Sequence, residues 1–453
     1  MDKVRSTSRI GVLVVQHAKF TILLCMLCFL TVIRVIIGIN IPVILYLLFS
    51  FFICLICDTN EIISYMCALL PLASQFQFRY AILIGGVFIV IKKGLRKFKI
   101  VEFIPLFLIM IWELMHANMS QLTGYGYLQE FSELILISII LAYPPGNYSD
   151  GLPYRTFSYV TVFSCFINLF ASIKMLGFSL NSVERLGRIN VEDAYERYMG
   201  LQDPNTMSFT CIIAISSLLL LRYKNSSKSS DTLVIYILLA FVLLSQSKSA
   251  LLSVVLMYFL YMLTGGKSSF STNKVLSRIS IGVIFLLTAA IGFSSSIEGF
   301  IGRFSMADLS TNRLAVFAFY FDHLSKSLSY ILFGIGLYKY TSQIGRIYGE
   351  IWKLYPGLAS YADNRIVYKP CHNNVLEIIV VWGIPGVILF AWFISKIIRH
   401  QKMTDKISVI PLTILMIYSL QGQLVGTGQA LLGLMITLVC VDFLPKKYVD
   451  ALD

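Results

Sequence analysis

The sequence predicts an all-α polytopic membrane protein, and its composition and the arrangement of its apolar residues support this. The chain has 453 residues, of which 57% are hydrophobic and only 13% are charged. A soluble domain carries about 25% charged residues, and a soluble core of this length could not bury so much apolar surface. The mean hydropathy is +0.77, and the apolar residues gather in long runs that are typical of membrane-spanning helices.

The apolar runs predict about 12–14 transmembrane helices, because several runs are shorter than the roughly 20 residues that an untilted crossing needs. The runs cover residues 20–38, 41–57, 62–76, 80–91, 100–115, 130–143, 157–176, 204–221, 231–244, 249–264, 279–295, 373–396, 408–421 and 424–442.

Clusters of Lys and Arg in the short loops set the expected orientation. Basic residues gather before the first run and at 92–99, 222–228, 267–278 and 396–406. With the N-terminus inside and an even number of crossings, all these clusters fall on the cytoplasmic side, as the positive-inside rule requires. We therefore expect a multi-pass protein with both termini in the cytoplasm. The net charge of +13 follows from these loops and does not indicate nucleic acid binding.

The loops divide the chain into five expected parts. These are N-terminal transmembrane helices at 1–176, a first external loop at 177–203, central transmembrane helices at 204–295, a long external loop at 296–371 and C-terminal transmembrane helices at 372–453. Loops this long are usually functional. The long loop contains an apolar stretch, Leu314 to Leu332, that predicts a helix lying at the membrane interface.

Several motifs of common enzyme classes are absent. The sequence has no D-x-D pair, no H-E-x-x-H and no G-x-S-x-G, and Gly266-Lys267-Ser268 lacks the first glycine of a phosphate loop. These absences argue against metal-dependent, ATP-driven and serine-hydrolase chemistry, and we expect neither a metal nor a cofactor.

Cationic side chains in the predicted external segments are the first candidates for function. Topology does not require them there, and a guanidinium binds phosphate oxygens in a two-point fork. An anionic ligand explains them, and a solvated surface of ion pairs is the alternative. The residues are Arg185, Arg188, Lys248, Arg303, Arg313 and Arg346.

His372 is the candidate general base. It follows Pro370 and opens an apolar run at the predicted external face. The positive end of the helix dipole favours a neutral imidazole, which could take a proton from a sugar hydroxyl. The alternative is a histidine that caps the helix. Glu377 lies five residues later in the apolar run, where a charge is costly, and is a candidate to orient the site.

Four motifs occur in order over about residues 180–395. The first is R-L-G-R followed by Q-D-P-N at 202–205, and the second is S-Q-S-K-S-A-L-L around Lys248. The third is Asn312-Arg313 ahead of L-F-G-I-G at 332–336. The fourth is H-N-N-V-L at 372–376 ahead of G-I-P-G at 383–386. The motifs and their order resemble those of the bacterial O-antigen polymerase and ligase superfamily.

The resemblance implies a lipid-linked glycosyltransferase (GT-C-like) architecture with a long penultimate external loop, in the bacterial inner membrane. It implies metal-independent glycosyl transfer from an undecaprenyl-diphosphate-linked oligosaccharide. Membrane lipid is an expected partner, and a chain-length regulator protein is a partner that the resemblance allows.

The resemblance also implies roles for individual residues. His372 would be the base, and the donor diphosphate would contact Arg185, Arg188, Lys248 and Arg313. Lys248 stands where the family often has arginine. The supporting residues would be Arg303, Arg346, Asp203, Asn205, Asn373 and Glu377.

Three functions remain open at this point. A polymerase is favoured because the first external loop is developed and because Arg346 and Gly357 fit the R-x10-G pattern described for polymerases. A ligase that transfers the finished chain to lipid A-core shares the same chemistry. A polysaccharide flippase or exporter would also suit the hydrophobic pattern.

Overall fold

The part of the chain that the structure, a computed structural model, describes is helical except for one short ribbon and the connections. It describes residues 17–39, 41–75, 78–95, 99–116, 126–142, 151–176, 204–223, 227–245, 247–263, 313–355, 366–368, 370–400, 410 and 413–414, with only the backbone at some helix ends. Each expected apolar run between residues 20 and 264 coincides with a helix. The runs at 279–295 and 424–442, and nearly all of 408–421, lie outside the described residues.

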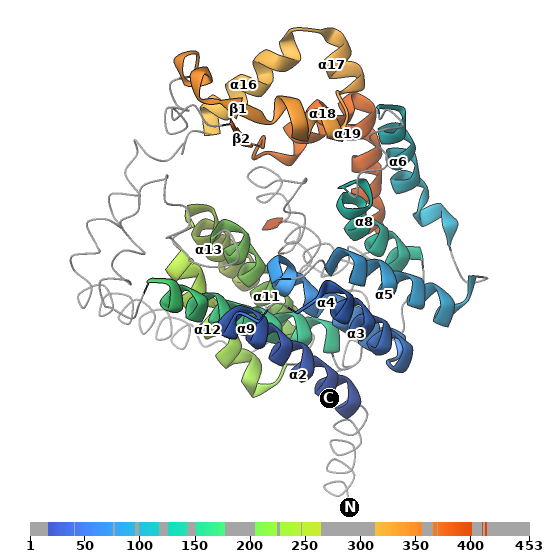
Figure 1. The fold of residues 1–453 in the computed structure, drawn as a ribbon, viewed down its shortest axis with the longest axis vertical. Coiled ribbons are helices and arrows are strands. Elements are labelled where there is room, and N and C mark those ends of the chain that lie inside the picture. Colours follow the sequence, from blue (N-terminus) through green and yellow to red (C-terminus); the bar gives the residue numbers. More distant parts are fainter. Residues whose placement is uncertain are drawn as a thin grey trace, which may run out of the picture.

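The first group of helices forms the body of the molecule, in blue and green in Figure 1. Its helices are α2 (Ala18–Val32), α3 (Val43–Ile56), α4 (Thr59–Leu69), α5 (Phe78–Lys93), α9 (Leu152–Leu176), α11 (Pro204–Tyr223), α12 (Ser229–Ser245) and α13 (Lys248–Leu263). The π-helix η1 (Ile33–Ile37) extends α2, and the 3-10 helix η2 (Leu70–Gln75) extends α4. The closest packing joins α11 to α12 and α9, and α4 to α9.

The second group forms a cap at the end of the molecule away from the start of α2 (Figure 1). It contains α16 (Arg313–Ser325), α17 (Leu328–Phe333), α18 (Leu337–Lys339), the π-helix η7 (Tyr340–Ile344), β1 (Arg346–Tyr348), η8 (Gly349–Lys353) and β2 (Ile366–Tyr368). Three helices connect the cap to the body along one side: α19 (Asn374–His400), α6 (Ile104–His116, preceded by η4, Ile100–Glu102) and α8 (Gly126–Ala142). In the cap, α17 packs against α19, which in turn packs against α6. In the body, α5 packs against α8.

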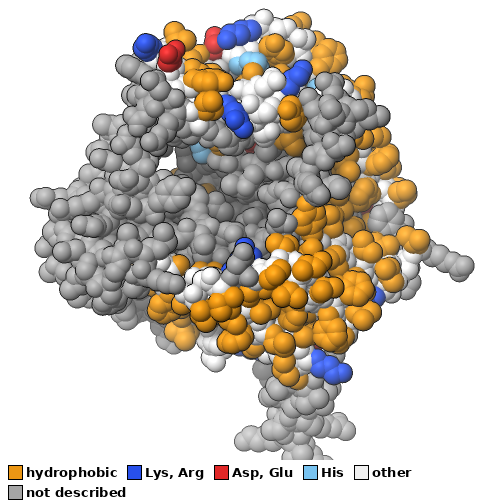
Figure 2. Space-filling view, in the orientation of Figure 1, with side chains coloured by type: hydrophobic (Ala, Val, Ile, Leu, Met, Phe, Trp, Pro, Cys, Tyr) orange, Lys and Arg blue, Asp and Glu red, His pale blue; other side chains and the backbone are white. Residues whose placement is uncertain are grey.

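The distribution of apolar side chains fits a membrane protein. Every side chain of α11 from Met207 to Leu221 is buried, so this helix lies inside the bundle. Large apolar side chains of the outer helices are instead exposed, among them Phe29, Leu48 and Ile91. Figure 2 shows such side chains covering the described surface of the body, whereas Asp and Glu gather on the cap. A soluble monomer rarely exposes apolar patches of this extent.

Two described helices, at Ala18–Ile37 and Asn374–Lys396, are long and apolar enough to cross a membrane, and several shorter ones are apolar. The number of crossings, the orientation and the five-part division remain predictions.

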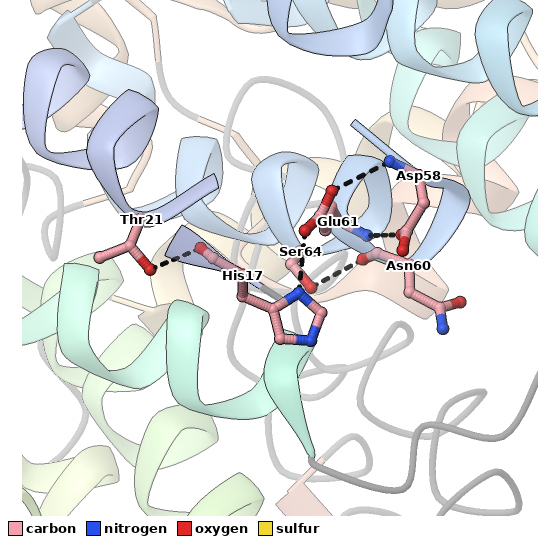
Figure 3. Close-up of polar contacts among 6 residues, drawn as sticks. All are labelled: His17, Thr21, Asp58, Asn60, Glu61 and Ser64. Carbon is pink, nitrogen blue, oxygen red and sulfur yellow. Dashed lines mark hydrogen bonds and ion pairs between the residues drawn. The ribbon is translucent and has the colours of Figure 1, made fainter. Parts of the chain in front are cut away.

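At the end of the body away from the cap, side chains bind the backbone groups that are left free at helix ends. Asp58 and Glu61 form a capping box at the start of α4, and Glu61 Oε1 lies 2.8 Å from His17 Nδ1, just before α2 (Figure 3). Lys92 Nζ donates to the backbone oxygens of Leu55 and Cys57 at the end of α3. Lysine at this position satisfies carbonyls that have no helical donor.

A buried ion pair joins α9 to α12. Arg155 Nε lies 3.4 Å from Asp231 Oδ2, and both side chains are more than nine-tenths buried. Asp231 also accepts hydrogen bonds from the Tyr159 hydroxyl at 2.9 Å and from the Lys228 backbone N–H at 2.7 Å. These donors provide the hydrogen bonds that offset the cost of burying the Asp231 carboxylate.

The described part of the long loop adds two details to the predicted all-α class, which its helices support. The stretch from Leu314 to Leu332 is not one helix, because Ser327 adopts an extended backbone and its hydroxyl caps α17 by accepting from the Ser329 N–H. The all-α class also omits an antiparallel ribbon that pairs Arg346–Tyr348 with Ile366–Tyr368. Apart from Arg346, the residues of both strands are β-branched or aromatic, and such residues favour extended structure.

Candidate functional site

The site is built around a kink in α19. Gly383 has a non-helical backbone (φ 65°, ψ −162°), and Pro385 follows inside the same helix. Because proline has no N–H, the carbonyl of Val381 has no helical donor four residues later. A buried carbonyl must find another donor.

The loop after α17 supplies the missing donors. Ile335 N–H donates to Val380 O at 3.0 Å, and Gly336 N–H donates to Val381 O at 2.8 Å. The indole N–H of Trp112, on α6, donates to Trp382 O at 2.9 Å. The L-F-G-I-G and G-I-P-G motifs, about 50 residues apart in the sequence, therefore meet in one junction.

Glycine is required where the two chains touch. A Cβ on Gly334 would lie 2.4 Å from Val381 O, and a Cβ on Gly383 would lie 2.6 Å from Leu332 O. Both residues also have a positive φ, which side-chain-bearing residues rarely adopt. The close approach and the backbone conformation each explain these glycines.

Glu113 of α6 holds the other side of the junction. Its carboxylate is 1% exposed. It accepts from the Leu337 N–H, at 3.0 and 3.1 Å to its two oxygens, and from the Trp382 indole N–H at 2.6 Å. The sequence prediction missed Glu113, although a lone acid inside an apolar run is a signal of function or of a specific buried partner.

His116 adds a further tie between α6 and the loop. Its Nδ1 lies 2.8 Å from Trp112 O, and its Nε2 lies 2.8 Å from Phe333 O. The ring of His116 thus ties its own helix to the end of α17 through two backbone carbonyls.

His372 lies two residues before the start of α19, near the helix start that the sequence predicts. Its backbone has φ 52°, and among the described residues it is the one non-glycine with a positive φ. Asn373 caps the helix: its side-chain oxygen accepts from the Leu376 N–H at 3.0 Å. Capping of the Leu376 N–H therefore falls to Asn373.

The groups beside His372 are buried. Glu377 is 1% exposed in the first turn of α19, where the helix dipole favours a carboxylate. Asn374 is 2% exposed, and within the described part of the chain neither of its amide atoms has a hydrogen-bond partner. Burial, and then the nearby Glu377, raise the pKa of the Cys371 thiol, which disfavours the thiolate form that a nucleophile needs.

The ribbon brings Arg346 toward this region. Arg346 is exposed on β1 and pairs in register with Tyr368, four residues before His372. Arg346, His372, Asn373 and Glu377 thus belong to the cap and the start of α19.

The structure does not place the remaining predicted residues. Lys248, Arg313 and Asn205 lie in the first turns of α13, α16 and α11, but their side chains are not described. The residues outside the described ranges are Arg185, Arg188, Asp203 and Arg303. Within the described residues, no three His, Cys, Asp or Glu side chains form a group that could hold a metal ion.

Comparison with known proteins bears on the same region. Residues 233–391 match a family described as O-Antigen ligase. The match includes Lys248, the junction motifs and His372, whereas Glu113 and the R-L-G-R motif lie outside it. No curated protein matches the chain. The match supports the O-antigen polymerase and ligase superfamily, whose members are membrane-associated enzymes that transfer glycosyl groups.

Proposed function

We propose that the protein polymerises undecaprenyl-diphosphate-linked oligosaccharide repeats into O-antigen or capsular polysaccharide, at the outer face of the bacterial inner membrane. The observation that carries the proposal is the backbone of His372. A strained non-glycine residue close to the start of a helix, inside the matched domain, is typical of a functional position.

In the proposed reaction, a hydroxyl oxygen of the acceptor sugar bonds to the anomeric carbon of the donor. The bond from that carbon to the diphosphate oxygen breaks, and the lipid diphosphate leaves with the electron pair. His372 accepts the hydroxyl proton. Arg185, Arg188, Lys248 and Arg313 stabilise the charge that grows on the diphosphate, and Arg346 and Arg303 support them. Asp203 and Asn205 shape the entrance next to α11.

The base is tested by His372→Ala, with His400→Ala at the other end of α19 as the matched control. Purified protein is incubated with lipid-linked oligosaccharide extracted from a strain that lacks this gene, and products are resolved on a gel. We expect His372→Ala to lose product formation, because the variant lacks the proposed base, and His400→Ala to keep it. Full activity of a well-folded His372→Ala variant refutes the base assignment.

A ligase is the second candidate, and the description of the matched family favours it. The phenotype of a deletion strain separates the two functions. Loss of a polymerase leaves one repeat unit on lipid A-core, whereas loss of a ligase leaves bare core. A flippase or exporter would instead lengthen no chains in the purified assay.

A further inference from the structure

The left-handed backbone of His372 is unfavourable for a side-chain-bearing residue, so its surroundings must hold it. On the C-terminal side, Asn373 fixes the chain through its cap and through its carbonyl, which accepts from the Glu377 N–H at 2.9 Å. On the N-terminal side, the Cys371 N–H donates to the hydroxyl of Tyr340 at 3.0 Å. These contacts fix the backbone on both sides of the imidazole.

Tyr340 is itself held firmly. Its side chain is 0% exposed, and its ring lies 5.9 Å from that of Tyr320 on α16. Its backbone N–H donates to Gly336 O at 3.1 Å, so it belongs to the turn that begins at the glycine junction.

The start of that turn is fixed by Glu113. The carboxylate accepts the Leu337 N–H, the first of α18, and also the Trp382 indole N–H of α19. The contacts run from α6 through α18 and Tyr340 to the peptide next to His372.

We propose that Tyr340 is a positioning residue that sets the place of the His372 imidazole, and that Glu113 holds Tyr340 for this purpose. The inference rests on the proposed role of His372 as the base. A base must lie within hydrogen-bond reach of the hydroxyl, and a displacement of about 1 Å can lower the rate on the order of 100-fold.

Tyr340→Phe tests this because it keeps the ring and removes the hydroxyl that accepts the Cys371 N–H. Tyr338→Phe is the matched control, since Tyr338 lies on the same turn but is 41% exposed. Turnover of the extracted lipid-linked oligosaccharide is measured per amount of monodisperse protein. We expect kcat of Tyr340→Phe to fall about 10- to 100-fold with KM within about twofold, and Tyr338→Phe to match the wild type.

Two further measurements separate positioning from general destabilisation. The pH at which kcat is half-maximal should shift in Tyr340→Phe, because the base has a new environment, and should stay constant in Tyr338→Phe. Glu113→Gln, which keeps one acceptor oxygen but turns an NH₂ group toward donors, should also lower kcat without raising KM.

The outcomes distinguish the two proposals. If His372→Ala is inactive but Tyr340→Phe keeps the wild-type kcat and pH profile, the positioning role is wrong and the base assignment stands. A loss in Tyr340→Phe without a shift of the pH profile also overturns positioning. If His372→Ala is fully active, both proposals fail.

Discussion

Gly334→Ala should destabilise the junction between the two glycine motifs by more than the cost of its backbone conformation alone. Gly334 has φ 76° and ψ −172°, a region that is essentially restricted to glycine, and forcing alanine into it costs about 1–3 kcal/mol. The new Cβ would lie 2.4 Å from Val381 O, which is backbone and cannot rotate away.

The loop must therefore move off α19. It would lose the hydrogen bonds from Ile335 and Gly336, at about 1 kcal/mol each. The total, about 3–5 kcal/mol, is a large part of the roughly 5–15 kcal/mol that stabilises a folded domain.

Gly94→Ala is the matched control. Gly94 also has a positive φ of 80°, but a Cβ there would meet nothing within 4 Å. Gly94→Ala should therefore lower the free energy of unfolding only by the cost of a left-handed backbone at an alanine, about 1–2 kcal/mol. The assay is the thermal unfolding midpoint of the purified full chain in detergent, followed by fluorescence-detected size exclusion. Equal midpoints for Gly334→Ala and Gly94→Ala would refute the close-approach argument.

The other predictions concern one ion pair and one histidine. Asp231→Ala should lower the free energy of unfolding by about 3–5 kcal/mol, because it leaves Arg155 buried without its carboxylate partner. The control Asp322→Ala, which breaks the exposed pair with Lys326, should leave the unfolding midpoint unchanged. Equal falls in the midpoints of the two variants would contradict this prediction. Burial, and then Lys326, lower the pKa of His323, so stability should fall as pH drops through the ordinary histidine range near 6.5. His323→Phe, which keeps the stack on Tyr330, should make the unfolding midpoint vary less with pH between about pH 7.5 and 5.5. A pH dependence equal to that of the wild type would contradict the role of His323.

Local patterns predicted the helices well, and they also placed the start of α19. A run of apolar residues has few alternatives to a helix in a membrane, because every backbone group must be satisfied inside the segment. Pro370 and the H-N-N sequence mark the helix start at Asn374, since asparagine caps helices well.

Contacts between distant segments could not be predicted in this way. Glu113 reaches the Leu337 N–H across 224 positions, and no local pattern reports such a pairing. The break at Ser327 was missed because a serine is compatible with a helix interior as well as with a helix cap, and the stretch contains three serines. The ribbon was missed because its strands have three residues each, too few for an alternating pattern to show.

The ribbon has a practical consequence for engineering. It clamps the two ends of the segment 349–365 together, since Tyr348 pairs with Ile366. Because the paired strands hold both ends of this segment, we expect that its length and sequence can be replaced by those of a relative while the two ends stay in place. Chimaeras cut at Tyr348 and Ile366 would therefore transplant this part of the loop without displacing the helix that follows.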